Sequence, residues 1–162
     1  MPEGTAVDFA VVAFREDGHW QVSSLPPRAA EDLHSFTHAL RQQPSEGVAI
    51  GLCVFDDDFF LAVRPRGDEI RLLVSDATAA ADWSVAAQAL EMVDEPVPDA
   101  ADDEQVRPGG DLAIFADLGM SAMELSAVCG DLELYPDEML GQIAARIGFG
   151  PQFERAVETD AE

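Results

Sequence analysis

Apolar residues in the first half of the chain follow the short-period pattern of β-strands. The stretch VDFAVVAF (Val7–Phe14) is apolar on both alternations, as expected for a central strand. After the turn residues Glu16–Gly18, the stretch HWQVSS alternates apolar and polar positions, which predicts a half-exposed strand. Three further strands are predicted over Val48–Phe55, Phe59–Arg66 and Glu69–Ser75, since each is rich in β-branched or aromatic residues.

The apolar period becomes helical in two segments of the same half, from Arg28 to Gln42 and from Thr78 to Val93. The positions on one helical face are Leu33, Phe36, Thr37 and Leu40 in the first segment and Trp83, Ala86, Ala87 and Leu90 in the second. The element order is therefore β-β-α-β-β-β-α. Short hairpin links favour a five-stranded antiparallel sheet with helices on one side, which is an α+β fold.

The stretch DEPVPDAADDEQVRPGG (Asp94–Gly110) has the composition of a linker. It holds three prolines, two glycines and six acidic residues, and almost no large apolar residue. Charge repulsion extends such a segment, and proline and glycine oppose regular structure. We expect a sheet domain over residues 1–93, an acidic linker over residues 94–110, and a helical unit over residues 111–162 with a frayed acidic tail.

Two helices are predicted after the linker. Their apolar stripes are Leu118, Ala122, Leu125 and Cys129 in the first, and Leu140, Ile143, Ala144 and Ile147, followed by Phe149 and Phe153, in the second. Pro136 lies in the first turn of the second helix, where its missing N–H costs nothing. Asp137 and Glu138 lie where the helix dipole favours negative charge, and Gly148 is placed to end the helix.

The charge of the chain is strongly negative. There are 32 acidic residues against nine basic residues, which gives a net charge of −23. Such a field repels nucleic acid and anionic membranes and attracts basic proteins, so we expect no direct binding to nucleic acid or membranes. Acidity also serves solubility, so the composition alone leaves two interpretations open, a basic partner and simple solubility.

The sequence also indicates a cytoplasmic protein. The start of the chain lacks the basic and apolar regions of a signal peptide. The apolar run Val48–Phe55 is far shorter than the roughly 20 residues that a membrane-spanning helix needs. Cys53 and Cys129 lie within apolar patterns, and we expect them to be buried, reduced and free of metal.

No catalytic or cofactor-binding motif is present in the sequence. The nucleophile elbow, the GxGxxG and P-loop motifs and the zinc deaminase signature are absent. His34 and His38 are spaced i, i+4 with Glu31 one turn earlier, which resembles half of a zinc site. They lie off the apolar face, however, and exposed histidines are the simpler interpretation. We expect no metal, no cofactor and no enzyme activity, with an enzyme of unknown type as a remote alternative.

Three arginines gather in the predicted hairpin RPRGDEIR. A two-residue turn at Gly67–Asp68 pairs Arg66 with Glu69 and Arg64 with Arg71. Two like charges directly opposite each other are destabilising unless an acid or a ligand lies between them. Two alternatives follow: internal pairing with acids from the linker or helices, or a patch for a partner that carries carboxylate or phosphate groups.

Four segments carry a resemblance to a known family. They are DFAVVAFREDGHWQV, FFLAVRPRGDEIRLLVSDATAAADW, DLAIFADLGMSAMELSAVC and DLELYPDEMLGQIAARIGFGPQFERAV. Together they resemble the tRNA adenosine deaminase-associated proteins of high-GC Gram-positive bacteria. The resemblance implies a connection to wobble-adenosine deamination through a neighbouring deaminase gene, and it implies no catalytic residues. The element order also resembles roadblock, longin and profilin-like modules, which serve as dimerisation or docking scaffolds.

These observations predict a non-enzymatic acidic accessory protein that binds or modulates a basic partner, which the resemblance identifies as a tRNA adenosine deaminase. The candidate partner-binding residues are Arg64, Arg66 and Arg71 in the hairpin and Asp131, Glu133, Asp137 and Glu138 around the start of the last predicted helix. The alternative is a homodimeric roadblock-like scaffold unrelated to tRNA, with a sheet edge or a helix as its interface.

Overall fold

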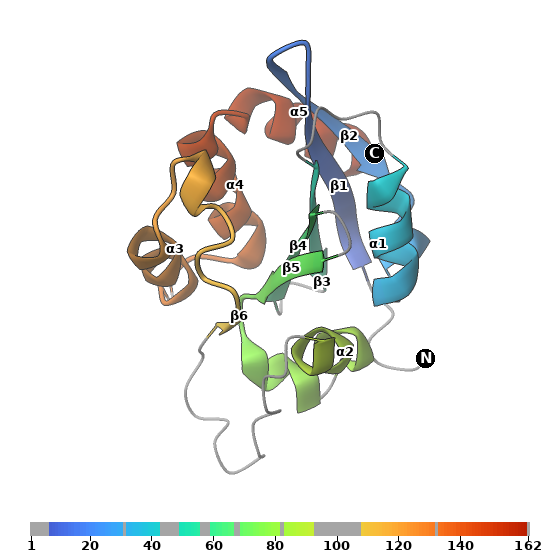
Figure 1. Cartoon of the computed structure of the whole chain (residues 1–162), viewed down its shortest axis with the longest axis vertical. Coiled ribbons are helices and arrows are strands. Elements are labelled where there is room, and N and C mark those ends of the chain that lie inside the picture. Colours follow the sequence, from blue (N-terminus) through green and yellow to red (C-terminus); the bar gives the residue numbers. More distant parts are fainter. Residues whose placement is uncertain are drawn as a thin grey trace.

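The computed structural model describes residues 7–161 of the chain except 31, 43–48, 56–58, 67–68, 82, 93–107 and 132. It confirms an α+β fold with an antiparallel sheet. The sheet lies between two groups of helices, with α3 (Ala122–Cys129) and α4 (Pro136–Ile147) on one side and α1 (Leu33–Arg41) on the other (Figure 1). The likeness to roadblock modules stays a prediction.

The sheet has six strands in the order β2-β1-β3-β4-β5-β6. They are β1 (Val7–Glu16), β2 (His19–Leu25), β3 (Ala49–Phe55), β4 (Phe59–Arg66), β5 (Glu69–Val74) and β6 (Gly109–Gly110). All five predicted strands are present, and β6 corrects the expected count of five. The two-residue strand lies in the last part of the predicted linker, and the rest of that linker, 94–107, lies outside the described residues.

Two glycines form β6 because no larger residue fits there. A Cβ atom on Gly109 would lie 2.7 Å from Leu90 Cδ2, and one on Gly110 would lie 2.5 Å from the Leu72 carbonyl oxygen. Gly110 also has a φ of 107°, which residues with side chains rarely adopt. Glycine is a poor strand former. The two glycines that let β6 approach β5 and α2 closely therefore look like linker residues in the sequence.

The helices are α1 (Leu33–Arg41), α2 (Ser84–Met92), α3 (Ala122–Cys129), α4 (Pro136–Ile147) and α5 (Gly150–Ala161). Helix α1 begins later than the predicted Arg28 because Asp32 caps it. Asp32 has extended backbone angles, and its carboxylate accepts a hydrogen bond from the Ser35 N–H at 3.0 Å. The four predicted apolar positions of α1 are all buried.

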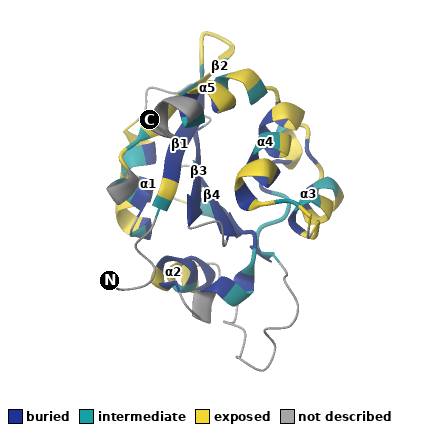
Figure 2. Cartoon of the chain, turned by 180° about the vertical axis from the view of Figure 1, so that it is seen from behind, coloured by how far each residue is buried: buried dark blue, intermediate teal, exposed yellow. Residues whose placement is uncertain are grey.

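Helices cover both faces of the sheet. The two helices of the first half, α1 and α2, lie on the same face, as predicted, and α3, α4 and α5 cover the other. The central strands bury alternate residues in two separate cores. One core contains Val11, Leu52 and Phe60 beneath α3, α4 and α5, and the other contains Val12, Cys53 and Leu61 beneath α1 and α2. Figure 2 shows these strands as a buried layer between helices whose outer surfaces are exposed.

Helix α4 buries the predicted stripe. Leu140, Ile143, Ala144 and Ile147 all belong to the core between the sheet and the C-terminal helices. Gly148 ends the helix as predicted, with a φ of 122° and its N–H donating to Ala144 O.

A further helix, α5, begins at Gly150, where the sequence pattern predicts only aromatic residues and a frayed tail. Phe149 packs on Trp20 with ring centroids 5.0 Å apart, and Phe153 packs edge-on against Phe9 at 5.9 Å. Pairs of this geometry add to the free energy gained by burial alone. These aromatic residues therefore attach α5 to β1 and β2.

Both cysteines are buried and unpaired, as predicted. Burial raises the pKa of the Cys129 thiol to about 12 and also raises the pKa of the Cys53 thiol. Both side chains are therefore packed as neutral core groups.

Truncation of Ile143 to alanine tests whether α4 is held by its apolar stripe. Ile143 has no exposed surface, so we expect the Ile143→Ala variant to lose about 2–5 kcal/mol of unfolding free energy. The exposed neighbour Gln142 offers a matched control, and Gln142→Ala should change stability by less than about 0.5 kcal/mol. Urea denaturation measures both. Equal stability of the two variants would contradict the packing of α4 on the sheet.

Candidate functional site

Strands β4 and β5 hold Arg64 and Arg71 directly opposite each other, as the hairpin pattern predicts. The Arg64 guanidinium donates to both carboxylate oxygens of Asp117, at 2.7 and 2.8 Å, and its Nη1 also donates to Ile114 O at 2.8 Å. Arg64 is only 2% exposed. A two-pronged contact of this kind is among the stronger charge-assisted hydrogen bonds, and it offsets the burial of the cation.

Arg71 has an acid of its own. Its Nε pairs with Asp111 Oδ2, and its Nη2 donates to Ala113 O at 2.9 Å. The other Asp111 oxygen accepts the Ala113 N–H at 2.9 Å, and the Asp111 N–H donates to Leu72 O at 2.8 Å. The two arginines therefore fasten the segment after β6 to the outer part of the sheet.

Of the two alternatives for the hairpin arginines, the structure shows internal pairing for Arg64 and Arg71, each of which binds an acid of the same chain. The buried Arg64 guanidinium is not accessible to a partner in this arrangement, and the side chain of Arg66 lies outside the described residues. The acids that pair with the arginines, Asp111 and Asp117, were not predicted. The sequence holds 32 acids, and nothing in the local pattern distinguishes these two from the rest. Their position beside the arginines depends on how the segment after the predicted linker folds back onto the sheet.

The other candidate residues lie together in sequence around the start of α4. We call Asp131, Glu133, Asp137 and Glu138 the α4 acids. All four are exposed, and two of them also shape the backbone: Asp131 Oδ1 accepts the Glu133 N–H and Glu138 Oε1 accepts the Tyr135 N–H, both at 3.0 Å. The second contact is half of a capping box.

Tyr135 is 64% exposed, and it lies in sequence between two pairs of the α4 acids. Among the residues that the structure describes, the three ion pairs found do not involve any α4 acid. The start of α4 therefore presents four exposed acids without a described countercharge, close in sequence to an exposed aromatic residue.

One of those three ion pairs joins α3 to α4. Arg146 donates from Nε to Glu124 Oε2 at 2.7 Å, and both side chains are about half exposed. Hydrogen bonding from Arg146, with help from the Ser121 backbone, lowers the pKa of Glu124 to about 2. Because its charge is paired with Arg146, we do not count Glu124 among the acids available to bind a partner.

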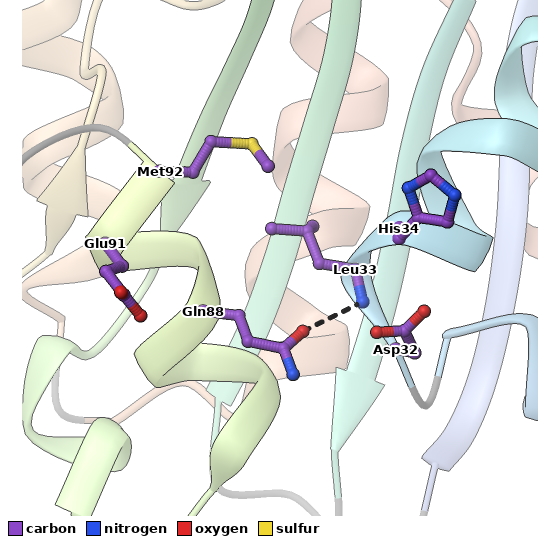
Figure 3. Close-up of a pocket in the computed structure, with 6 residues that line it drawn as sticks. All are labelled: Asp32, Leu33, His34, Gln88, Glu91 and Met92. Atoms are coloured by element: carbon purple, nitrogen blue, oxygen red, sulfur yellow. Dashed lines mark hydrogen bonds between the residues drawn. The ribbon is translucent and has the colours of Figure 1, made fainter.

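A hollow of about 340 Å³ lies between the start of α1 and the end of α2 (Figure 3). The Leu33 N–H donates to Gln88 Oε1 at 3.2 Å and bridges the two helices at its floor. The residues that line it are Asp32, Leu33, His34, Gln88, Glu91 and Met92. Its mixed lining and shallow shape show no constellation of nucleophile, base and acid.

The histidine pair of α1 lies on the exposed side, as the sequence pattern indicates. His34 lines the hollow, and His38 contacts Gln42 through Nε2 at 3.1 Å. Glu31, the third member of the predicted arrangement, lies outside the described residues. No group of three histidine, cysteine or carboxylate side chains in the described ranges is placed to hold a metal ion.

Comparison with known proteins decides the family. The model of the Rv3753c-like tRNA adenosine deaminase-associated protein family matches residues 8–150. The chain belongs to this family. It is also 37% identical to Protein Rv3753c of Mycobacterium tuberculosis over 151 residues, which cover 93% of this chain and 87% of that protein. No solved structure matches the chain.

The span matched by the family model runs from β1 to the start of α5. It includes both arginine pairs and the α4 acids. The family resemblance predicted from the four quoted segments is thus confirmed.

No helix in the described part of the chain is long and apolar enough to cross a membrane.

Replacement of Asp117 tests the buried arginine. In Asp117→Asn the Arg64 guanidinium keeps one amide oxygen but loses its countercharge, so we expect a loss of about 1–3 kcal/mol of unfolding free energy. Asp137→Asn makes the same chemical change at an exposed position and should change stability by less than about 0.5 kcal/mol. Denaturant midpoints compare the two. If both variants matched the parent, the Arg64–Asp117 pair would not hold the segment after β6.

The Glu124–Arg146 pair makes a prediction about pH. The folded pKa of Glu124 lies below its ordinary 4.5, so the pair stabilises the fold above that pH and the contribution disappears as pH falls through about 2. In Arg146→Gln we expect the pKa of Glu124 to rise towards 4.5, because the hydrogen bond from Arg146, the main cause of the low pKa, is removed. Carboxyl titration by NMR measures this. Arg15→Gln is the control, and an unchanged pKa in Arg146→Gln would contradict the assignment.

Proposed function

We propose that this chain is a non-enzymatic accessory protein that binds a tRNA adenosine deaminase through the α4 acids. The observation that carries the proposal is membership of a family described by its association with that enzyme. The zinc deaminase signature is absent from the sequence, which supports a companion of the enzyme rather than the enzyme itself.

The charge of the surface supports the choice of partner. An enzyme that binds tRNA presents lysine and arginine to the phosphate backbone. The α4 acids have the opposite sign, and the net charge of −23 would steer such a partner towards them. The same charge disfavours a direct role in holding tRNA.

Tyr135 supplies the apolar component of this surface. Charged groups at the rim of an interface mainly set the association rate, whereas aromatic residues at its centre carry much of the affinity. Tyr135 is largely exposed and is followed by Pro136 at the first position of α4. The ring therefore projects from a backbone that α4 has already ordered, so little conformational entropy is lost on binding.

A docking site over basic residues of the deaminase implies regulation. The accessory protein and tRNA would compete for the same positively charged surface of the enzyme. Occupancy by the accessory protein would then reduce access of tRNA.

Neutralising the α4 acids tests the docking surface. The variant Asp131→Asn/Glu133→Gln/Asp137→Asn/Glu138→Gln retains the amide oxygens that accept the two backbone hydrogen bonds, so its fold should be unchanged. Loss of four interface charges at about 0.2–1 kcal/mol each should weaken binding to the deaminase about fourfold or more at low salt. The difference should shrink as salt rises. Calorimetry with the purified deaminase of the same organism measures this.

A charge-matched control separates local docking from the general field. Glu16→Gln/Asp17→Asn/Glu91→Gln/Glu154→Gln removes four exposed acids from other elements and changes the net charge equally. It should bind within about twofold of the parent at physiological salt, where charges more than about 8 Å away are screened. Equal loss in both variants, or unchanged binding in both, would refute docking at α4.

A further inference from the structure

Strand β2 presents an open edge of the sheet. Its hairpin with β1 turns at Asp17 and Gly18, with φ values of 55° and 77°, so Glu16 and His19 form the hydrogen-bonded pair that closes a two-residue turn. Every second residue of β2 after His19 therefore also bonds to β1. The residues between them direct their backbone N–H and C=O groups away from β1, towards the open edge of the sheet.

These outward residues are Trp20, Val22 and Ser24. The Trp20 carbonyl accepts a hydrogen bond from Gln152 Nε2 of α5 at 3.3 Å. In the described part of the chain, nothing pairs with the outward backbone groups of Val22 and Ser24. A hollow of about 270 Å³ lies beside them, between β2 and α5. Its lining residues are Gln21, Val22, Ser24, Gln152, Arg155 and Ala156.

Helix α5 lies beside this edge, but the strand itself lacks several features that usually prevent strand addition. Its residues HWQVSSL include no lysine, no proline and no acid, and the pairing of β1 with β2 runs without a bulge. The absence of acids matters in a chain with 32 of them. The strand residues of two β2 edges bring no carboxylates together. On the opposite side of the sheet, β6 already pairs with the end of β5.

We propose that β2 pairs antiparallel with β2 of a second copy, with Val22 opposite Ser24 of that copy. The two-fold axis then passes between the two Ser23 residues, and the outward groups of Val22 and Ser24 form four hydrogen bonds. In this register Pro26, which has no N–H, lies opposite Trp20, whose carbonyl already has Gln152 as its donor. The Pro26 carbonyl accepts the Ala29 N–H of its own chain at 2.9 Å, so the pairing between copies is carried by Val22 and Ser24.

This register makes a geometric prediction about Ser23. It faces Ser23 of the second copy as a non-hydrogen-bonded pair, with Cα atoms about 4.5 Å apart. That separation lies within the range that a disulfide bond requires. Ser23 is exposed, and the native Cys53 and Cys129 are buried, so they do not compete for oxidation.

The experiment uses the full chain with Ser23→Cys under mild oxidation. We expect a covalent dimer of twice the 17.4 kDa chain mass on non-reducing gels. Gln21→Cys is the matched control, because it lies on the same exposed strand but opposite Leu25 of the second copy, so it should form no disulfide and should run as a single chain on the same gels. Cross-linking of both variants to the same extent, or of neither, would overturn the proposed pairing.

A second measurement uses no cysteine. Ser24→Pro removes an N–H that points away from β1, so the hairpin keeps its own hydrogen bonds while the edge loses a donor. Sedimentation equilibrium should show the parent as a dimer that tightens as salt screens repulsion between two copies, and the variant as a monomer with the same circular dichroism. Deaminase docking should weaken with salt, so the two proposals fail separately. A parent that stays monomeric at millimolar concentration, or a variant that dimerises like the parent, would refute the β2 interface.

Discussion

The structure depends on a sheet whose central strands are apolar on both faces. In the central parts of β1, β3 and β4, the side chains on both faces of the sheet are buried, so each face needs its own cover of helices. α1 and α2 cover one face, and α3, α4 and α5 cover the other. The C-terminal helices are thus a part of the core of the sheet, and the buried Arg64 with its partner Asp117 fixes the segment that leads to them. Hydrophobic burial selects the three-layer arrangement, and the ion pair fixes where the chain enters the second layer.

Local patterns in the sequence predict what local physics determines. The stripes of α1 and α4, the cap at Gly148 and the opposition of Arg64 and Arg71 all follow from spacing within one or two elements. Contacts between distant segments were beyond such reasoning. The strand formed by Gly109 and Gly110 exists only because β5 and α2 leave room for nothing larger, and α5 is ordered by aromatic residues that pack on β1 and β2.

The candidate surfaces illustrate the same division. The sequence indicates that opposed arginines need an anion, but it does not say that the anions are Asp111 and Asp117, 40 to 53 residues further along the chain. It does identify the α4 acids, because a helix start is a local feature. Charge consequently has two separate uses in this molecule. The paired arginines act inside the fold, where their partners are fixed, and the α4 acids stand outside it without a described countercharge.

The contact between Gln152 and Trp20 joins residues 132 positions apart, and Phe153 meets Phe9 across a similar interval. Strands β1 and β2 therefore receive part of their cover from α5, which is synthesised well after them. While the chain is still on the ribosome, one apolar face of the sheet is complete but uncovered, and it stays so until α4 and α5 have emerged. A message that ends early, or a nick before Pro136, would leave a sheet with that face open to water. Quality control in the cell would meet such fragments as aggregation-prone species, which makes intact α4 and α5 helices a condition for solubility during synthesis.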